Sequence, residues 1–194
     1  GTTAGFVGFD SSTKGNWVGA YGSQGHTLIN DGSSMPSWAS MTTAETFAYT
    51  WAPTTTDVRA LRKVGNQSDR IAATWYTGAA FTPNSKFDIN LNLTDGQAHR
   101  LALYTIDWDN SSRSEVFEII NTATGAVLDT RPVSSFSGGV YVVWQVSGQV
   151  TIRVKNASAA SANALVSGIF LDAASGTTPT PTPAVTPTPT PTPT

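Results

Sequence analysis

Alternation of apolar and polar residues is the clearest pattern in this chain, and it predicts strands. Within residues 85–93, apolar and polar residues alternate. The apolar positions are Phe87, Ile89, Leu91 and Leu93, and the polar positions between them are Asp88, Asn90 and Asn92. Side chains two residues apart share one face of a strand. The segment is therefore predicted to be a half-buried antiparallel strand. Asp95-Gly96 follows as a turn dipeptide, so we expect a hairpin to the strand that His99 opens.

Short strands separated by turn residues fill the rest of the chain up to residue 174. They are expected at 1–10, 26–30, 37–42, 70–76, 114–121, 127–133 (as partner of 114–121), 140–147, 150–154 and 165–171. Phe47, Tyr49 and Trp51 alternate in a further strand that ends at Pro53, and we assign Trp51 and Trp144 to the core. A helical turn is considered only at 59–64. We expect an all-β fold, a two-sheet antiparallel β-sandwich of the jelly-roll kind.

The composition changes abruptly at Ser175. The run TTPTPTPAVTPTPTPTPT that follows holds most of the prolines of the chain. Proline fixes φ and removes the backbone N–H, so a disordered or polyproline II linker is expected. The sequence thus predicts a β-sandwich module over 1–174 and a Thr-Pro linker over 175–194. Such a linker would tether a further domain or a surface attachment, and its threonines could carry O-glycans.

Composition excludes several classes of function. Charged residues make up 12% and the net charge is -2. With no basic run, a nucleic-acid partner is not expected. The absence of cysteine rules out disulfides and thiolate sites. No apolar run reaches the roughly 20 residues of a membrane span. The low-charge, Ser/Thr-rich composition indicates an extracellular protein, secreted or on the cell surface.

Enzyme signatures are also missing. Neither His26 nor His99 belongs to an HExxH motif, and there is no GxSxG elbow. His99 directly follows a turn, so we expect it to be a hydrogen-bonded turn residue. Asp107 and Asp109 lie at one strand end, whereas the two carboxylates of a glycosidase flank a cleft from separate elements. We therefore expect a protein that is not an enzyme.

Residues 101–113, LALYTIDWDNSSR, contain the densest cluster of interacting groups. If extended geometry continues, Asp107 and Asp109 share one face and Trp108 points to the other. Two interpretations stay open. Either Trp108 closes a core while the aspartates hold Arg113, or the strand has ended and the group faces a ligand.

Aromatic residues outside the alternating strands are candidates for a binding face. Gly15, Gly19, Gly22 and Gly25 surround the first of them and indicate tight turns or close backbone approach. Sugars stack their C–H faces on aromatic rings, and their hydroxyls pair with carboxylates and guanidinium groups. The predicted ligand-binding residues are Trp17, Tyr21, Trp38, Asp107, Trp108, Asp109 and Arg113. No cofactor is required, although the two aspartates could hold a structural Ca²⁺ without any EF-hand spacing.

Several stretches resemble one kind of bacterial extracellular module. They are GNWVGAYGSQG, WYTGAAFT, FDINLNLTDGQAHRLALYTIDWDNSSR, SSFSGGVYVVWQVSGQVTIRV and ALVSGIF. Together they span Phe6 to Leu171 and resemble galactose-binding-like β-sandwich modules appended to secreted glycoside hydrolases. The resemblance implies a non-catalytic carbohydrate-binding module for a polysaccharide or oligosaccharide. It marks Gly15, Asn16, Trp17, Tyr21, the DWD motif and Arg113 as the recurring residues.

A second hypothesis is a structural or adhesive subunit of an extracellular cell-surface assembly. The domain would then self-associate, and the Thr-Pro segment would be a glycosylated stalk. The two hypotheses make different demands on the exposed aromatic rings. A glycan-binding module needs them open to solvent, whereas a subunit buries them against its neighbour.

Overall fold

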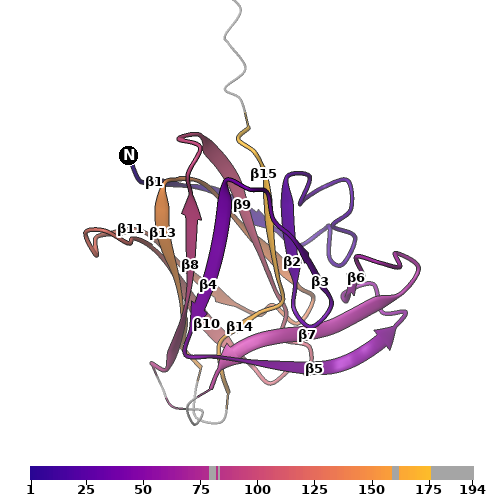
Figure 1. Ribbon diagram of the computed structural model, residues 1–194. Helices are drawn as coiled ribbons and strands as arrows, with labels where there is room; N and C mark the ends of the chain where they lie inside the picture. Colours follow the sequence, from indigo (N-terminus) through magenta and orange to yellow (C-terminus); the bar gives the residue numbers. More distant parts are fainter. Residues whose placement is uncertain (79–81, 83, 159–161, 176–194) are drawn as a thin grey trace, which may run out of the picture.

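The computed structural model describes residues 1–78, 82, 84–158 and 162–175. These residues form 15 β-strands, paired antiparallel, and no helix. The predicted all-β antiparallel sandwich is therefore confirmed (Figure 1). None of the described residues belongs to a helix of a length and apolarity that could cross a membrane. Beyond Ser175, the predicted linker lies outside the described residues.

Two large sheets make up the sandwich. The six-stranded sheet has the order β1 (Thr3–Asp10), β12 (Val140–Ser147), β9 (Ala98–Thr105), β15 (Gly168–Ala173), β2 (Gly25–Leu28) and β3 (Gly32–Ser34). The five-stranded sheet has the order β11 (Val127–Ser134), β10 (Ser114–Asn121), β13 (Gln149–Asn156), β8 (Lys86–Leu93) and β4 (Ala39–Ala44). The predicted pairing of β10 with β11 is present.

A third, smaller sheet was not expected from the sequence. It contains β14 (Leu165–Val166), β7 (Arg70–Thr77) and β5 (Thr46–Thr55), and β6 (Leu61–Arg62) also pairs with β7. In Figure 1, β5 and β7 run across the lower side of the molecule, crossing the direction of the strands above them. Strand β5 is therefore the edge of this sheet.

The main core fills the space between the two large sheets. Its fully buried side chains come from alternate positions of six strands: Leu101, Leu103, Val142, Trp144, Ile169 and Leu171 face Phe87, Ile89, Phe117, Ile119, Ile152 and Val154. On β8, each of the four alternating apolar side chains, from Phe87 to Leu93, is at most 4% exposed. The predicted half-buried strand and the core position of Trp144 are both confirmed.

A second core covers the opposite face of the six-stranded sheet. Segments 11–24 and 56–64, the second of which contains β6, contribute Trp17 and Leu61, which pack on Tyr104, Tyr141 and Phe170 from the sheet. Strands β9 and β12 are consequently buried on both faces, which is why most of their residues are apolar instead of alternating with polar ones.

Gly15 allows these two loop segments to meet. Its N–H donates to the Val58 carbonyl at 2.9 Å. A Cβ added to Gly15 would lie 1.8 Å from the carbonyl oxygen of Ala60, so no larger residue fits without displacing the backbone. The close backbone approach predicted for the glycine-rich segment is therefore found at Gly15.

The expected hairpin of β8 and β9 is wrong. The turn exists, with Gly96 at φ 73° and the Gln97 N–H donating to Asp95 at 3.0 Å. However, β8 pairs with β4 and β13, and β9 pairs with β12 and β15. Strand β9 is buried on both faces and must lie inside the doubly covered sheet, whereas β8 keeps a polar face for solvent. The turn therefore carries the chain from one sheet to the other.

Two smaller expectations are also corrected. Strand β5 continues through Pro53 to Thr55 instead of ending at the proline. A proline is tolerated there because β5 is an edge strand whose register shifts between Ala52 and Thr55. The helical turn considered at 59–64 is absent from these described residues, which contain β6 instead.

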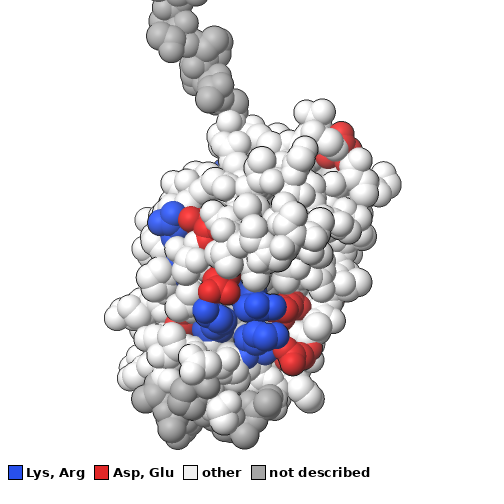
Figure 2. All heavy atoms as spheres, turned by 90° about the vertical axis from the view of Figure 1, so that its left-hand side faces the viewer, with Lys and Arg blue, Asp and Glu red and all other residues white. Residues whose placement is uncertain are grey.

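The outward face of the five-stranded sheet carries closely paired charges (Figure 2). Arg153 binds Asp88 at 2.9 Å, and Lys155 binds Glu118 at 2.5 Å. A further pair on this face is Lys86–Glu45, at 2.7 Å. Because acidic and basic groups neutralise one another side by side, this face offers little net charge to an ionic partner.

Candidate functional site

The polar segment after β9 is a tight loop and not a continued strand. Strand β9 ends at Thr105, and the loop turns at Asn110 and Ser112, whose φ angles are 53° and 57°. Asparagine is one of the few residue types that enter this left-handed region readily. The loop folds back so that Asp107 and Asp109 both reach the side chain of Arg113.

Arg113 lies at the centre of this loop and is 8% exposed. Its Nη1 donates to Asp107 at 2.6 Å and also to Asp109, and its Nε donates to the side-chain oxygen of Asn163 at 3.1 Å. Asp107 is 3% exposed and also accepts the Ser111 N–H at 3.0 Å. A buried charge without a partner is costly, so the two aspartates and the arginine depend on one another. The aspartates hold Arg113, as the first interpretation expects, and the strand has ended before them, as the second expects.

Asp109 is the solvent-facing member of this trio, with a side chain 43% exposed. Partial burial raises the pKa of its carboxyl, but the hydrogen bonds and charge of Arg113 outweigh that effect and hold the pKa below its usual value. Burial lowers the pKa of Arg113, and bonding to Asp109 and Asp107 more than reverses this. The exposed Asp109 is therefore ionised at neutral pH.

Strand β5 presents a row of aromatic rings on the open side of the small sheet. Phe47 and Tyr49 are 55% and 54% exposed, and Trp51 is half-buried. The pairing of Phe47 with Tyr76 on β7 adds another ring, whose centre lies 5.9 Å from that of Phe47. Tyr49 and Trp51 are 6.0 Å apart and nearly perpendicular, at 79°. Contiguous exposed rings of this kind mark an interaction surface.

The aromatic row and the Arg113 loop meet at one hollow of about 350 Å³, which we call the aromatic hollow. Its walls are formed by Tyr49, Trp51, Thr74, Tyr76, Asp109, Arg113, Asn163 and Leu165. The guanidinium carbon of Arg113 lies 6.0 Å from the centre of the Trp51 ring. Flat rings, an exposed carboxylate and a fixed guanidinium therefore border the same space.

Trp17 and Tyr21 lie away from this hollow and are used inside the protein. Trp17 is 5% exposed, and its indole N–H donates to the Arg62 carbonyl at 2.8 Å. The Tyr21 ring stacks on Tyr141 at 4.3 Å, and the Arg100 guanidinium carbon lies 5.0 Å from its centre. Neither ring has the free face that stacking on a ligand needs.

Trp38 is at the opposite end of β9 from the Arg113 loop. Its half-buried ring stacks on His99 at 3.9 Å. The His99 ring nitrogens lie 2.9 Å from the side-chain oxygens of Gln24 and Asp95. His99 is thus the hydrogen-bonded turn histidine that the sequence predicted, and Trp38 packs upon it.

Trp108 points away from the two aspartates beside it. Its half-buried ring packs against the second core, with the guanidinium carbon of Arg59 4.5 Å from the ring centre. It does not line the aromatic hollow. The structure therefore brings together Asp107, Asp109 and Arg113 of the predicted site residues. It places Trp17 and Tyr21 together at another hollow, and Trp38 and Trp108 apart from both groups.

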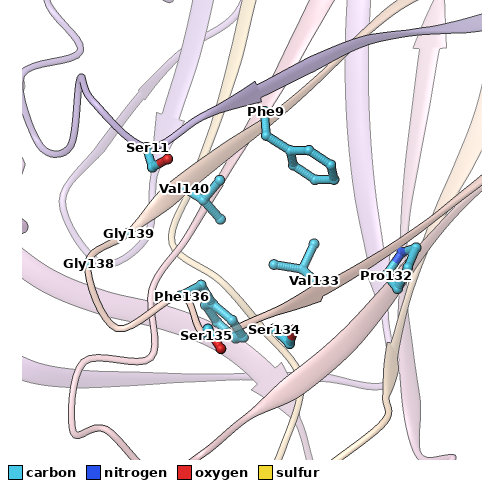
Figure 3. A pocket seen from close by; sticks show the side chains of 10 residues that line it. All are labelled: Phe9, Ser11, Pro132, Val133, Ser134, Ser135, Phe136, Gly138, Gly139 and Val140. Carbon is cyan, nitrogen blue, oxygen red and sulfur yellow. The ribbon is translucent and has the colours of Figure 1, made fainter.

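Two further hollows have different chemistry. One of about 320 Å³ lies between the end of β1 and the segment after β11, where Phe9, Val133 and Val140 project toward the space (Figure 3). No charged side chain is among the described residues that line it. The other, of about 460 Å³, lies beside Tyr21 and Arg100, whose groups are engaged within the protein. Of these three, only the aromatic hollow combines an exposed aromatic surface with a carboxylate and a guanidinium group.

Sequence reasoning missed the aromatic residues of the hollow. Phe47, Tyr49 and Trp51 alternate like a core strand, and Trp51 was expected in the core. Phe47 and Tyr49 are instead open to solvent, because β5 lies at the edge of the third sheet, whereas Trp51 is half-buried and packs against the main core. Pro53 was the available signal, since proline within a strand indicates an edge.

The predicted carboxylates do not fit a calcium ion. Asp107 and Asp109 share the guanidinium of Arg113, which occupies their oxygens and repels a cation. Across the part of the chain that the structure describes, no group of three or more His, Cys, Asp or Glu side chains is placed to hold a metal ion.

Comparisons with known proteins give a distant likeness. No family model and no curated protein matches the sequence. Among solved structures, a family 35 carbohydrate-binding module from Clostridium thermocellum matches at 10% identity, covering 69% of this chain and 92% of that one, with a TM-score of 0.40. The family 35 module from Paenibacillus barcinonensis matches at 15% identity over 76% and 98%, with a TM-score of 0.40.

An exo-β-1,3-galactanase from Phanerochaete chrysosporium, solved with β-1,3-galactotriose, matches at 18% identity over 73% of this chain and 30% of the enzyme, with a TM-score of 0.34. The first two neighbours are modules of the kind that the sequence resembles. At identities and TM-scores this low, the likeness carries no argument about ligand or site.

Proposed function

We propose that this chain is a non-catalytic carbohydrate-binding module and that the aromatic hollow is its binding site. The observation that carries the proposal is the meeting of Tyr49 and Trp51 with Asp109 and Arg113 at one open hollow. The C–H faces of sugar rings stack on aromatic rings, and sugar hydroxyls pair with carboxylate acceptors and guanidinium donors. The hollow supplies both kinds of contact.

The geometry suits a chain of sugars. Because Tyr49 and Trp51 stand nearly perpendicular, a sugar can stack on one ring while its edge contacts the other. From Trp51 the row extends four residues along β5 to Phe47, a length of roughly 13 Å. An oligosaccharide or polysaccharide therefore fits better than a single sugar. Arg113 is already fixed by Asp107 and Asn163, which lowers the entropic cost of binding.

The same hollow is poorly equipped for glycoside hydrolysis. Hydrolysis uses two carboxyl groups on either side of the scissile bond. Asp109 is the only carboxylate among the described residues that line the hollow, and it is bonded to Arg113. We therefore expect binding without turnover.

The setting of the module is part of the proposal. A surface with few charges and many Ser and Thr residues supports an extracellular location. The Thr-Pro segment supports a tether to a further domain of a larger secreted protein. In that setting the module would hold its parent protein at a glycan.

Replacing Tyr49 by alanine tests the site. The ring is 54% exposed, so its loss should remove stacking and little else. We expect roughly ten- to hundredfold weaker binding to the oligosaccharide that the intact protein selects on a glycan array. The melting temperature should change by about 2 °C or less. Isothermal titration calorimetry and thermal melts give the two numbers.

Phe9→Ala is the matched control, because Phe9 is similarly exposed, at 51%, and lies at another hollow. It should leave glycan affinity within about twofold of the intact protein. Equal losses in both variants, or none in Tyr49→Ala, would place the binding site elsewhere.

A second candidate is a self-associating subunit of a surface assembly. The observation in its favour is that β5 is an edge strand bearing the exposed rings of Phe47 and Tyr49. Such edges can pair with a second copy. Light scattering after size-exclusion chromatography separates the candidates. The glycan-binding proposal predicts a monomer, and a dimer that Tyr49→Ala dissociates would favour the subunit.

A further inference from the structure

We propose that the aromatic hollow selects neutral glycans over uronates, and that Asp109 sets this selectivity. The inference rests on the proposed function, because it names the class of glycan that the same site takes. It follows from a count of the charges that face the hollow.

The charged groups at the hollow do not balance. Asp109 and Arg113 are the charged residues in its described walls, and Arg113 also neutralises the buried Asp107. Two carboxylates thus share one guanidinium, which leaves one formal negative charge. The ion pairs near the two ends of β5 are balanced and do not offset it: Lys86–Glu45 and Lys63–Asp69.

Arg113, the positively charged member of the trio, is buried, whereas the carboxylate of Asp109 is exposed to solvent. Arg113 is 8% exposed, and its Nη1 and Nε already donate to Asp107, Asp109 and Asn163. An incoming carboxylate would have to compete with both aspartates for it. The Asp109 side chain is 43% exposed, so it meets the ligand first. It can accept hydrogen bonds from hydroxyl groups but can only repel a second carboxylate.

The size of the effect follows from Coulomb's law. Two carboxylates roughly 6 Å apart, at a dielectric constant between those of a protein surface and water, repel enough to weaken binding about tenfold. Because Asp109 is open to solvent, added salt should screen much of this repulsion.

The experiment compares matched probes by calorimetry. Hexasaccharides of glucose, galactose and mannose are each titrated beside the same hexasaccharide oxidised at C6 to the uronate. For a sugar that binds, the neutral form should bind about tenfold more tightly than the uronate in 20 mM NaCl. In 500 mM NaCl the ratio should fall to about two or three.

Asp109→Asn should bring the ratio at low salt close to one, because the trio then carries no net charge. Asp31→Asn changes the total charge equally at a residue that does not line the hollow, where Asp31 accepts the Val64 N–H, and should keep the ratio near ten.

The outcomes separate this inference from the proposed function. If no hexasaccharide of either kind binds, the proposed function fails and this inference falls with it. If neutral and acidic forms bind equally, or the acidic form binds more tightly, the selectivity is overturned while glycan binding stands. A tenfold ratio that persists in both Asp109→Asn and high salt would show that shape, and not Asp109, excludes the uronate.

Discussion

Replacing Arg113 by alanine is expected to lower the free energy of unfolding by about 3–5 kcal/mol, because it leaves Asp107 buried without its partner. Asp107 is 3% exposed, and Asp109 stands beside it. Without the guanidinium, two carboxylates would face each other across the loop. The loop would then rearrange, and glycan binding should be lost with it. Urea-induced unfolding measures the change in free energy.

Two further variants show whether the unpaired charge is the cause. Arg153→Ala removes an arginine from the solvent face of the five-stranded sheet, where its pair with Asp88 is worth no more than about 1 kcal/mol. Adding Asp107→Asn to Arg113→Ala should recover part of the lost stability, since asparagine still accepts hydrogen bonds but carries no charge. If Arg113→Ala lowered the free energy of unfolding by no more than Arg153→Ala does, the structural role of this trio would be contradicted.

Replacing Glu115 by glutamine is expected to stabilise the protein at pH 8. Glu115 is 1% exposed; its Oε2 accepts the Leu165 N–H at 2.7 Å, and none of the described residues forms a hydrogen bond with its Oε1. Burial raises the pKa of this carboxyl to about 8, and the Leu165 N–H opposes the shift only in part. Glutamine keeps an acceptor for Leu165, a residue in the wall of the aromatic hollow, and removes the titration.

The effect depends on pH in a defined direction. Below the ordinary pKa of 4.5 the carboxyl is protonated in both folded and unfolded protein, so it makes no difference to stability. As pH rises toward 8, the unfolded chain releases the proton and the folded protein keeps it. The intact protein should therefore lose stability relative to Glu115→Gln, by roughly 4–5 kcal/mol in total.

Unfolding of both proteins at pH 4, 6 and 8 measures this difference. Asp88→Asn should show no such trend over this range. Burial raises the pKa of Asp88, but bonding to Arg153 lowers it more, so its contribution is nearly constant from pH 4 upward and is lost only in stronger acid. A difference between Glu115→Gln and the intact protein that is the same at pH 4 and pH 8 would show that Glu115 titrates normally.

Local patterns account for the part of the fold that was predicted. Strand β8 was predicted because its period-two pattern depends only on its own residues. The sheet that each strand joins was not predictable in the same way. It depends on whether the second face is covered, and for β9 that cover comes from Trp17 and Leu61, which are distant in sequence.

In the candidate site, too, contacts within one segment were predictable and the arrangement of distant segments was not. The bonding of Asp107 and Asp109 to Arg113 could be predicted because the three residues lie within one short loop. The aromatic wall could not, because the exposure of Tyr49 is decided by the position of β5 at the edge of a third sheet. Glycine spacing drew attention to Trp17, whereas Gly15 in fact serves the packing of that loop.

The central claim is that sugars stack on the rings of the aromatic hollow. Intermolecular nuclear Overhauser effects between a bound neutral hexasaccharide and the aromatic protons of this protein test it most directly. The account predicts contacts from sugar C–H groups to the rings of Tyr49 and Trp51, with none to Phe9 or Trp38. Contacts to Phe9 or Trp38 without any to Tyr49 and Trp51 would contradict it.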